Sequence, residues 1–187
     1  MNDNCTVAKT PNFVEVIAGL RHRLANTAAP IGILVELYDD EVDPDLLAAS
    51  RNSIVKLERI LSLLGIIGNR GVGKLIFYPG ISVELDLDDL PLSWLPLATI
   101  IHNELGCDAL LHGATKASLV FARDKLIWRD NGAGFKQNVI DNFGLPQPEG
   151  NFGCGLGLLT VALTADRVGA QVCASNDGGA VLICSFK

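Results

Sequence analysis

Residues 130–135 read Asp-Asn-Gly-Ala-Gly-Phe (DNGAGF), and the fold can be worked out from this stretch outward. It follows KASLVFA (116–122) and DKLIWRD (124–130), two segments that read as strands around a tight Arg123-Asp124 turn. Gly132 and Gly134 permit a sharp backbone turn, and Asp130 offers a fixed hydrogen-bond acceptor. The stretch therefore predicts a polar loop directly after a strand, although a DNG sequence alone is also a common turn.

A second motif lies upstream, where ELGCDALLHGA (104–114) falls in a helix predicted from Leu95 to His112. Glu104 and Asp108 share one helix face with Leu111 or His112. Two carboxylates on one face suit a metal ion and a general base, whereas the plainer interpretation is a solvated helix face.

A third motif, GCGLGL (153–158), opens a helix predicted from Gly155 to about Arg167. Successive glycines expose backbone amides, and a helix N-terminus favours an anion, although many such segments are only helix caps. The three motifs in this order, each on its expected element, form a stronger signal than any one of them.

The remaining pattern of the second half predicts an α+β domain. ISVELDLDD (81–89) alternates like a strand, and AQVCASN (170–176) with AVLICSF (180–186) reads as a closing hairpin. Residues 131–153, rich in Gly, Asn and Pro, read as a long loop. We expect a layer of helices against one sheet.

The first third of the chain predicts two helices joined into an antiparallel hairpin. The first, from Phe13 to about Tyr38, carries a helical stripe of apolar residues: Val16, Ile17, Leu20, Leu24, Ala28, Ile31, Val35 and Leu37. Asp43 can cap the second helix, with Pro44 in its first turn, and this helix runs to about Ile66. One hairpin cannot bury both apolar faces, so we expect a homodimer with a four-helix bundle.

GNRGVGKL (68–75) resembles a phosphate-binding P-loop but lacks the context for one. A P-loop follows a strand and opens a helix, and its last hydroxyl ligates magnesium. Here a helix precedes the glycines, the apolar segment LIFYPG follows them, and Leu75 replaces the hydroxyl. We interpret residues 69–79 as a linker that permits a hinge motion.

Composition limits the classes of partner. The chain has 187 residues, 49% of them hydrophobic, and a net charge of −6 with a pI of about 5.0, which argues against nucleic-acid binding. It has neither an apolar run long enough for a membrane span nor a signal-peptide core, so we expect a cytoplasmic protein with no membrane partner. The cysteines are odd in number and widely spaced, which predicts buried, reduced thiols rather than a zinc site or disulfide framework: Cys5, Cys107, Cys154, Cys173 and Cys184.

The three motifs resemble the N-box, D-x-G-x-G box and G-x-G-x-G box of the Bergerat-type (GHKL) ATPase domain of two-component histidine kinases, over about residues 80–187. This resemblance implies an α/β sandwich that binds ATP and Mg2+. It implies that Asp130 accepts a hydrogen bond from adenine and that Asp108 is a magnesium ligand. Glu104 would stand where kinases have a polar residue and where relatives that hydrolyse ATP have a glutamate as general base. The implied adenine-pocket glycines are Gly132 and Gly134, and the implied phosphate-binding glycines are Gly153, Gly155 and Gly157. Residues 136–152 would form a short ATP lid.

LRHRLANTAAPIGIL (20–34) resembles the phosphoacceptor helix of the same kinases. His22 would accept the phosphoryl group, with Arg23 and Asn26 orienting it or neutralising charge. The pattern HRLAN is similar to the H-R-x-x-N form of the HWE-like subgroup. The implied domains are a dimerisation and phosphoacceptor hairpin (1–68), a linker (69–79) and an ATPase-like catalytic domain (80–187).

Three functions follow. The first is a histidine kinase that phosphorylates His22 with Mg-ATP and passes the group to an Asp of a response regulator receiver domain. The second is a histidine phosphotransferase with a degenerate ATPase-like domain. Three departures from the family favour it: Leu111 replaces the usual lysine, Asp108 is a carboxylate, and the lid is short. The third is a non-catalytic ATP-binding regulator, against which the hairpin with His22 argues. Because both glycine boxes are kept, the sequence favours the kinase.

Overall fold

The computed structural model describes residues 5–9, 75–145 and 156–186, together with 24, 28, 44–45, 47–50, 53–54 and 57. Residues 24, 28, 44–45, 47–50, 53–54 and 57 are helical. The expected hairpin as a whole, the glycines at 68, 71 and 73, and His22, Arg23 and Asn26 lie outside the described residues. Within the described part of the chain, no helix has the length and apolar character needed to cross a bilayer.

A six-stranded sheet forms one layer of the fold, with the strand order β1-β5-β6-β4-β3-β2. Only β2 and β3 run parallel, and every other neighbouring pair is antiparallel. The strands are β1 Thr6–Val7, β2 Ser82–Asp86, β3 Lys116–Ala122, β4 Lys125–Asp130, β5 Ala170–Asn176 and β6 Ala180–Phe186. The predicted strands β2 to β6 are confirmed within a few residues.

Helix α3, Leu95–Leu111, connects the two parallel strands and confirms the predicted helix. Parallel neighbours need a long crossover connection, and a helix is its usual form. A short 3-10 turn, η1 Leu92–Trp94, leads into α3, and Pro96 stands in its first turn, where a missing amide hydrogen costs nothing. Helix α3 is apolar on most of its circumference, so it is buried rather than lying on the surface.

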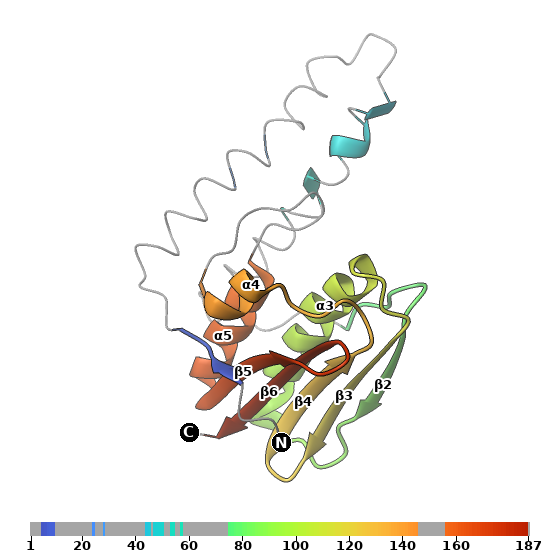
Figure 1. The fold of residues 1–187 in the computed structure, drawn as a ribbon. Coiled ribbons are helices and arrows are strands. Elements are labelled where there is room, and N and C mark those ends of the chain that lie inside the picture. The colour runs from blue at the N-terminus through green and yellow to red at the C-terminus, as the bar shows by residue number, and fades with distance from the viewer. Residues whose placement is uncertain are drawn as a thin grey trace.

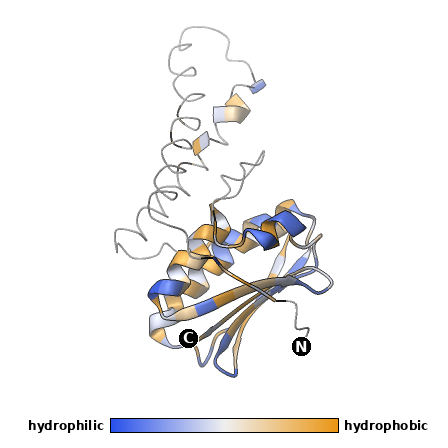
Figure 2. Ribbon diagram, turned by 60° about the vertical axis from the view of Figure 1, so that its left-hand side comes forward, coloured by the Kyte–Doolittle hydropathy of each residue, from blue (hydrophilic) through white to orange (hydrophobic). Residues whose placement is uncertain are grey.

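The second layer consists of helices that cover one face of the sheet. Helix α5, Gly157–Arg167, packs beside α3 and against β5, and both helices lie on the same side of the strands (Figure 1). Figure 2 shows apolar residues on both the helices and the strands. The core between these layers contains side chains that are entirely buried, among them Trp94, Ile101, Leu119, Trp128 and Leu182. The expected α+β layering of the second half is therefore confirmed.

Two tight turns close the hairpins as the sequence predicts. Arg123 and Asp124 join β3 to β4 with φ angles of 52° and 58°, so both adopt the left-handed region. Two such residues in succession are typical of a type I′ turn, whose twist matches that of the flanking strands. The β5–β6 turn uses Gly178, with φ 69°, in the same region.

The stretch 131–153, predicted as one long loop, contains a short helix. Helix α4, Gln137–Asp141, is followed by Phe143, which is completely buried. The Gly, Asn and Pro content of the whole stretch favours a loop. However, Ile140 and Phe143 are buried, and their burial holds this turn of helix in place.

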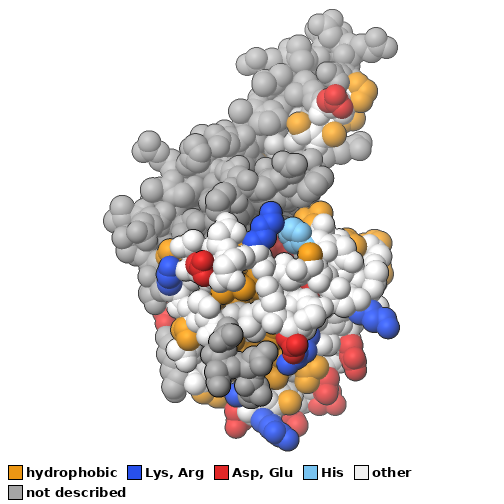
Figure 3. Space-filling view, viewed as in Figure 1, with side chains coloured by type: hydrophobic (Ala, Val, Ile, Leu, Met, Phe, Trp, Pro, Cys, Tyr) orange, Lys and Arg blue, Asp and Glu red, His pale blue; other side chains and the backbone are white. Residues whose placement is uncertain are grey.

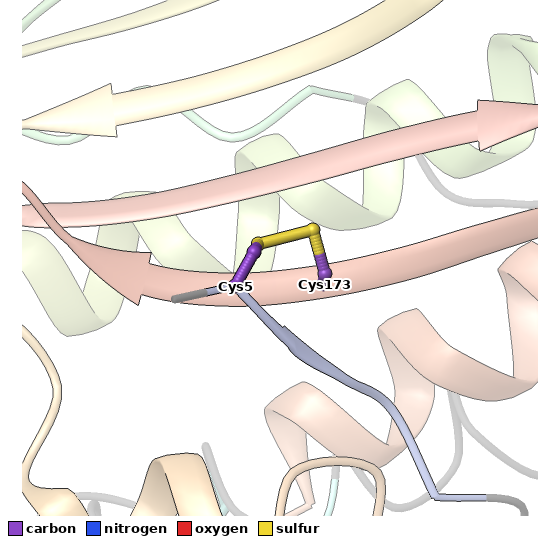
Figure 4. Close-up of a disulfide and its surroundings, with 2 residues drawn as sticks. All are labelled: Cys5 and Cys173. Carbon is purple, nitrogen blue, oxygen red and sulfur yellow. A yellow bond between two sulfur atoms is a disulfide. The ribbon is translucent and has the colours of Figure 1, made fainter. Parts of the chain in front are cut away.

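The expectation that the cysteines are reduced is wrong for one pair. Cys5 and Cys173 form a disulfide, with their Cα atoms 5.5 Å apart (Figure 4), whereas Cys107 and Cys184 are not part of it. The pair is separated by 168 residues in sequence, and it meets because β1 lies antiparallel to β5 at the sheet edge. Sequence reasoning gave no role to Thr6–Val7, so it had no basis for bringing the two cysteines together.

Acidic and basic side chains are interspersed on the described part of the face shown in Figure 3. The acidic residues of and after β2, Glu84, Asp86, Asp88 and Asp89, are all exposed at the opposite sheet edge from β1. The negative net charge is therefore carried in part by this edge.

We expect the double variant Arg123→Asn/Asp124→Gly to raise the free energy of unfolding by about 1 kcal/mol, because Asn and Gly adopt positive φ at lower cost than Arg and Asp. Urea unfolding followed by tryptophan fluorescence measures this, since the only two tryptophans of the chain, Trp94 and Trp128, are both in this core. Gly178→Ala is the opposite change and should lower stability by a similar amount. A double variant no more stable than the wild-type protein would contradict the turn assignment.

Candidate functional site

The tertiary structure brings the first and third motifs together at the start of α5. A Cβ atom at Gly157 would lie 3.0 Å from Glu104 Oε2 and 3.7 Å from Asp108 Oδ2, so the helix α5 start passes directly over these two side chains of α3. Glu104 is 6% exposed, and Asp108 is half-buried. The predicted common face of Glu104 and Asp108 is therefore turned towards the glycine motif rather than towards bulk solvent.

This arrangement places two carboxyl groups at the N-terminal end of a helix. The unpaired amides there carry a partial positive charge that favours a negative group. A side chain at residue 157 would make a tight contact with Glu104, which would have to shift to accommodate it. The amides at this helix end can interact with the two carboxylates themselves. They can also bind an added anion, if a cation offsets the negative charge of the anion and the carboxylates.

Asp130 closes β4 and is held by three hydrogen bonds. Its Oδ1 accepts from the amides of Gly132 at 2.9 Å and Ala180 at 3.2 Å, and its Oδ2 accepts from Trp128 Nε1 at 3.1 Å. A carboxylate has about four lone-pair sites, so one acceptor position remains for a ligand donor. The predicted role of Asp130 as a fixed acceptor agrees with this geometry.

The β5–β6 turn approaches the end of β4 closely. A Cβ atom at Gly179 would overlap the carbonyl group of Asp130, so only glycine fits there. This close packing and the Ala180–Asp130 bond attach the β5–β6 turn to the DNGAGF loop.

Asn176, which the sequence analysis did not single out, clamps that loop from the end of β5. Its Oδ1 accepts from the Phe135 amide at 2.8 Å, and its Nδ2 donates to the Phe135 carbonyl at 2.8 Å. Gly134 lies under this clamp with φ 76°, and a Cβ atom there would be 2.7 Å from Asn176 Oδ1. The loop therefore needs glycine at 134 for two reasons, the backbone angle and the space.

Asn131 anchors the other side of the same loop. Its Oδ1 accepts from the amides of Thr115 and Lys116, each at 2.9 Å, and its Nδ2 donates to Thr115 Oγ1 at 3.1 Å. The Ala133 amide reaches the carbonyl of His112 at 3.3 Å, just beyond the end of α3. The DNG sequence itself indicates a structural role for Asn131. The role of Asn176 follows only from its tertiary contact with Phe135.

Helix α3 thus carries both halves of the candidate site. Glu104 and Asp108 face the start of α5, and His112 at the helix end contacts the DNGAGF loop. Glu104 and His112 lie about 12 Å apart along the axis at 1.5 Å per residue. The structure therefore aligns the carboxylate pair and the Asp130 loop along one helix.

The end of the predicted linker is fixed against the middle of α3. The Ile76 amide donates to Asn103 Oδ1 at 2.9 Å, and the Tyr78 hydroxyl donates to the Asn103 carbonyl. The Tyr78 ring lies against Gly106, where a Cβ atom would be 2.7 Å from the ring. Residues 75–78 form an irregular segment.

Not every residue proposed for the site can be placed. Gly153 and Gly155 lie outside the described residues, as do His22, Arg23 and Asn26. Within the described ranges, no cluster of three or more His, Cys, Asp or Glu side chains could hold a metal ion by itself.

No protein-family model matches the sequence, and a search of curated proteins finds no significant match. Among solved structures, the fold is similar to the Acinetobacter baumannii histidine kinase AdeS, with a TM-score of 0.51 and 14% identity, over 90% of this chain and 96% of that one. The chain has a histidine-kinase-related fold. At this identity the similarity concerns the fold alone.

Two further solved structures match with TM-scores below 0.5. A bacterial phosphotransferase gives a TM-score of 0.48 at 15% identity, over 96% of this chain and all of the other. Full-length ShkA in complex with AMPPNP gives 0.45 at 16% identity, over 94% of this chain and 45% of ShkA.

We expect Gly134→Ala to lower the free energy of unfolding by about 2–3 kcal/mol, because the new methyl group is strained at φ 76° and displaces Asn176. Gly169→Ala is the matched control: Gly169 has φ 72° but open space around its Cβ position, so that change should cost about 1 kcal/mol. Urea unfolding followed by tryptophan fluorescence gives both values.

Asn176→Ala alone should cost about 1–2 kcal/mol for its two lost hydrogen bonds. In the double variant Gly134→Ala/Asn176→Ala the collision is gone, so the combined cost should be smaller than the sum of the two single costs. Strict additivity would show that Asn176 does not clamp Gly134.

Proposed function

We propose that this protein is a histidine kinase of two-component signalling, which binds Mg-ATP, phosphorylates His22 and passes the phosphoryl group to an Asp of a response regulator receiver domain. The observation that carries this proposal is the alignment along α3 of the Glu104–Asp108–Gly157 contact and the Asp130 loop. Residues of all three motifs, with Gly157 representing the third, lie along this one helix. The AdeS-like fold supports the same assignment.

The DNGAGF loop would bind the adenine base. Asp130 has an acceptor position left for the adenine amino group, and its three hydrogen bonds keep that position fixed. Gly132 and Gly134 add no side chains to the loop, and a Cβ atom at Gly132 would lie 3.3 Å from the Ala114 methyl group. A rigid acceptor with a bare loop beside it suits a flat heterocycle.

The start of α5 would bind the phosphates. Gly157, with Gly153 and Gly155 before it, would direct backbone amides at the phosphate oxygens. Asp108 would hold Mg2+ through its carboxylate, and Mg2+ when bound offsets the phosphate charge. Glu104, buried beside Gly157, is placed to accept a hydrogen bond or a proton at the phosphate end.

His22 would be the nucleophile. A neutral imidazole attacks a phosphoryl group at pH 7 and can carry it onward. Because such transfer depends mainly on positioning and charge stabilisation, Arg23 and Asn26 would neutralise and orient the transferred group. We place the reaction in the cytoplasm, with a homodimer formed through the helical hairpin of residues 1–68.

One observation favours a second candidate, a histidine phosphotransferase that relays phosphate between receiver domains without using ATP. The Glu104 carboxylate lies against the Gly157 backbone, where a phosphate would otherwise bind, and Asp108 adds a second negative group. The exposed side chain at position 111 is leucine, so it supplies no positive charge to offset them. Both candidates use His22 but differ in whether nucleotide binds.

Calorimetric titration with Mg-ATP separates these candidates. We expect the wild-type protein to bind in the micromolar range and Asp130→Asn to weaken binding about tenfold to a hundredfold, because an amide replaces a charged acceptor. Asp89→Asn, which alters an exposed carboxylate after β2, is the matched control and should leave affinity unchanged. If the folded wild-type protein gives no heat of binding beyond that of dilution, the kinase function is excluded and the phosphotransferase function remains.

Phosphate transfer tests His22 directly. With ATP labelled on its γ-phosphate, we expect acid-labile, alkali-stable label on the wild-type protein and none on His22→Gln, because His22 is the nucleophile. His112→Gln, a change at an exposed histidine, should keep the label.

The donor that labels His22 distinguishes the two functions. Label from a phosphorylated receiver domain but not from ATP would identify the phosphotransferase. Equal labelling of wild-type protein and His22→Gln, from either donor, would exclude both functions.

A further inference from the structure

Residues 5–9 form a short strap across the edge of the sheet. Thr6 and Val7 pair with Ala174 and Cys173 of β5, and the Ala8 amide donates to the Val172 carbonyl at 2.8 Å. This register puts Cys5 diagonally opposite Cys173 on the same side of the strand pair, where the disulfide joins them (Figure 4).

The strap also holds the turn that follows α4. The Lys9 amide donates to the Phe143 carbonyl at 2.8 Å, and Lys9 Nζ lies 3.5 Å from Asn142 Oδ1. Gly144, with φ 85°, packs so closely on Lys9 that a Cβ atom there would overlap the Lys9 carbonyl oxygen. The strap therefore connects two parts of the domain, the β5 edge and the Asn142–Gly144 turn.

The non-covalent contacts of the strap are few. Its strand has two residues, and Val7 is 47% exposed, so it buries little apolar area. Ordering five residues costs conformational entropy that a handful of backbone hydrogen bonds scarcely offsets. The disulfide therefore decides whether the strap stays in place.

The chemistry of the described thiols singles out this pair. Cys5 and Cys173 are both half-buried, so a small thiol or disulfide can reach them. Cys184 is fully buried, and this burial raises the pKa of its thiol far above the usual range, which suppresses the reactive thiolate. Cys107, on α3, is not part of this disulfide.

We propose that Cys5 and Cys173 form a redox-modification site, a reversible dithiol–disulfide pair that locks the strap onto the β5 edge and thereby fixes the Asn142–Gly144 turn. The oxidant is a low-molecular-weight disulfide such as oxidised glutathione. One cysteine thiolate attacks it to give a mixed disulfide and one released thiol. The second cysteine then displaces the other thiol, so two electrons pass to the reagent and two protons leave the cysteines for the released thiols.

The locked turn bears on the proposed nucleotide site through chain continuity. Gly144 and Leu145 lead directly into residues 146–155, which carry Gly153 and Gly155, and α5 follows with Gly157. Holding the Asn142–Gly144 turn in one conformation removes part of the conformational entropy that a ligand bound at the start of α5 would otherwise have to remove. The oxidised form should therefore bind Mg-ATP more tightly, an expectation that rests on the proposed function.

The test uses the full chain equilibrated with reduced or oxidised glutathione, then blocked by alkylation and digested without reduction. Mass spectrometry should find a Cys5–Cys173 linked peptide in the oxidised sample only. Hydrogen exchange should show the Ala8 and Lys9 amides and residues 142–145 exchanging at least about tenfold faster after reduction.

Two variants make the test specific. Cys5→Ser should exchange like the reduced protein in both buffers, and it leaves β5 unaltered. Cys107→Ser removes a thiol outside the pair and should respond to glutathione as the wild-type protein does. Absence of the linked peptide in the oxidised sample, or equal exchange at 142–145 in both states, overturns the proposal.

The nucleotide experiment is separate. We expect the dissociation constant for Mg-ATP to rise about fivefold or more on reduction of the wild-type protein and to be insensitive to glutathione in Cys5→Ser. If neither redox form binds Mg-ATP, the proposed kinase function fails, and the exchange result alone decides the redox site. Binding that is equal in both forms overturns the coupling to the nucleotide site.

Discussion

The burial of α3 between the sheet and α5 is the constraint on which the rest of this structure depends. The helix is apolar on most of its surface, so it is stable only when covered on both sides, by the strands below and by α5 beside it. Covering it fixes the start of α5 over Glu104 and Asp108, and it fixes the end of α3 against the loop after β4. The geometry of the candidate site is therefore a consequence of core packing rather than an addition to it.

Close backbone approach is the second theme, and it explains why the site is built from glycines. Gly134, Gly157 and Gly179 each occupy a position where a Cβ atom would meet a neighbouring polar group at 3.0 Å or less. These contacts bring amides and carboxylates together without intervening side chains, and Asn131 and Asn176 then satisfy the exposed loop backbone. Such a site is rigid because its polar groups already bond to one another, which lowers the entropy lost when a ligand binds.

The pattern of the sequence was sufficient for most of the local structure. Alternation in residues 81–89 and 116–130, and turn residues at 123–124 and 177–179, predicted the strands that the sheet contains. Periodicity with apolar content predicts α3, and an aspartate directly after a strand predicts an acceptor such as Asp130, which accepts three hydrogen bonds. The prediction failed where a short local signal depended on distant partners, as in α4, whose burial through Ile140 and Phe143 outweighs the surrounding glycines and asparagines.

By itself, then, the sequence determined strands β2 to β6, helices α3 and α5, and their order, because backbone propensity and hydrophobic period act over a few neighbouring residues. Only the tertiary structure decided which of these elements meet. It placed Gly157 over the carboxylates of α3, gave Asn176 its role on a loop 41 residues away, and joined Cys5 to Cys173 across 168 residues. Those contacts arise from strand order and from the burial of one helix, which depend on the whole chain at once.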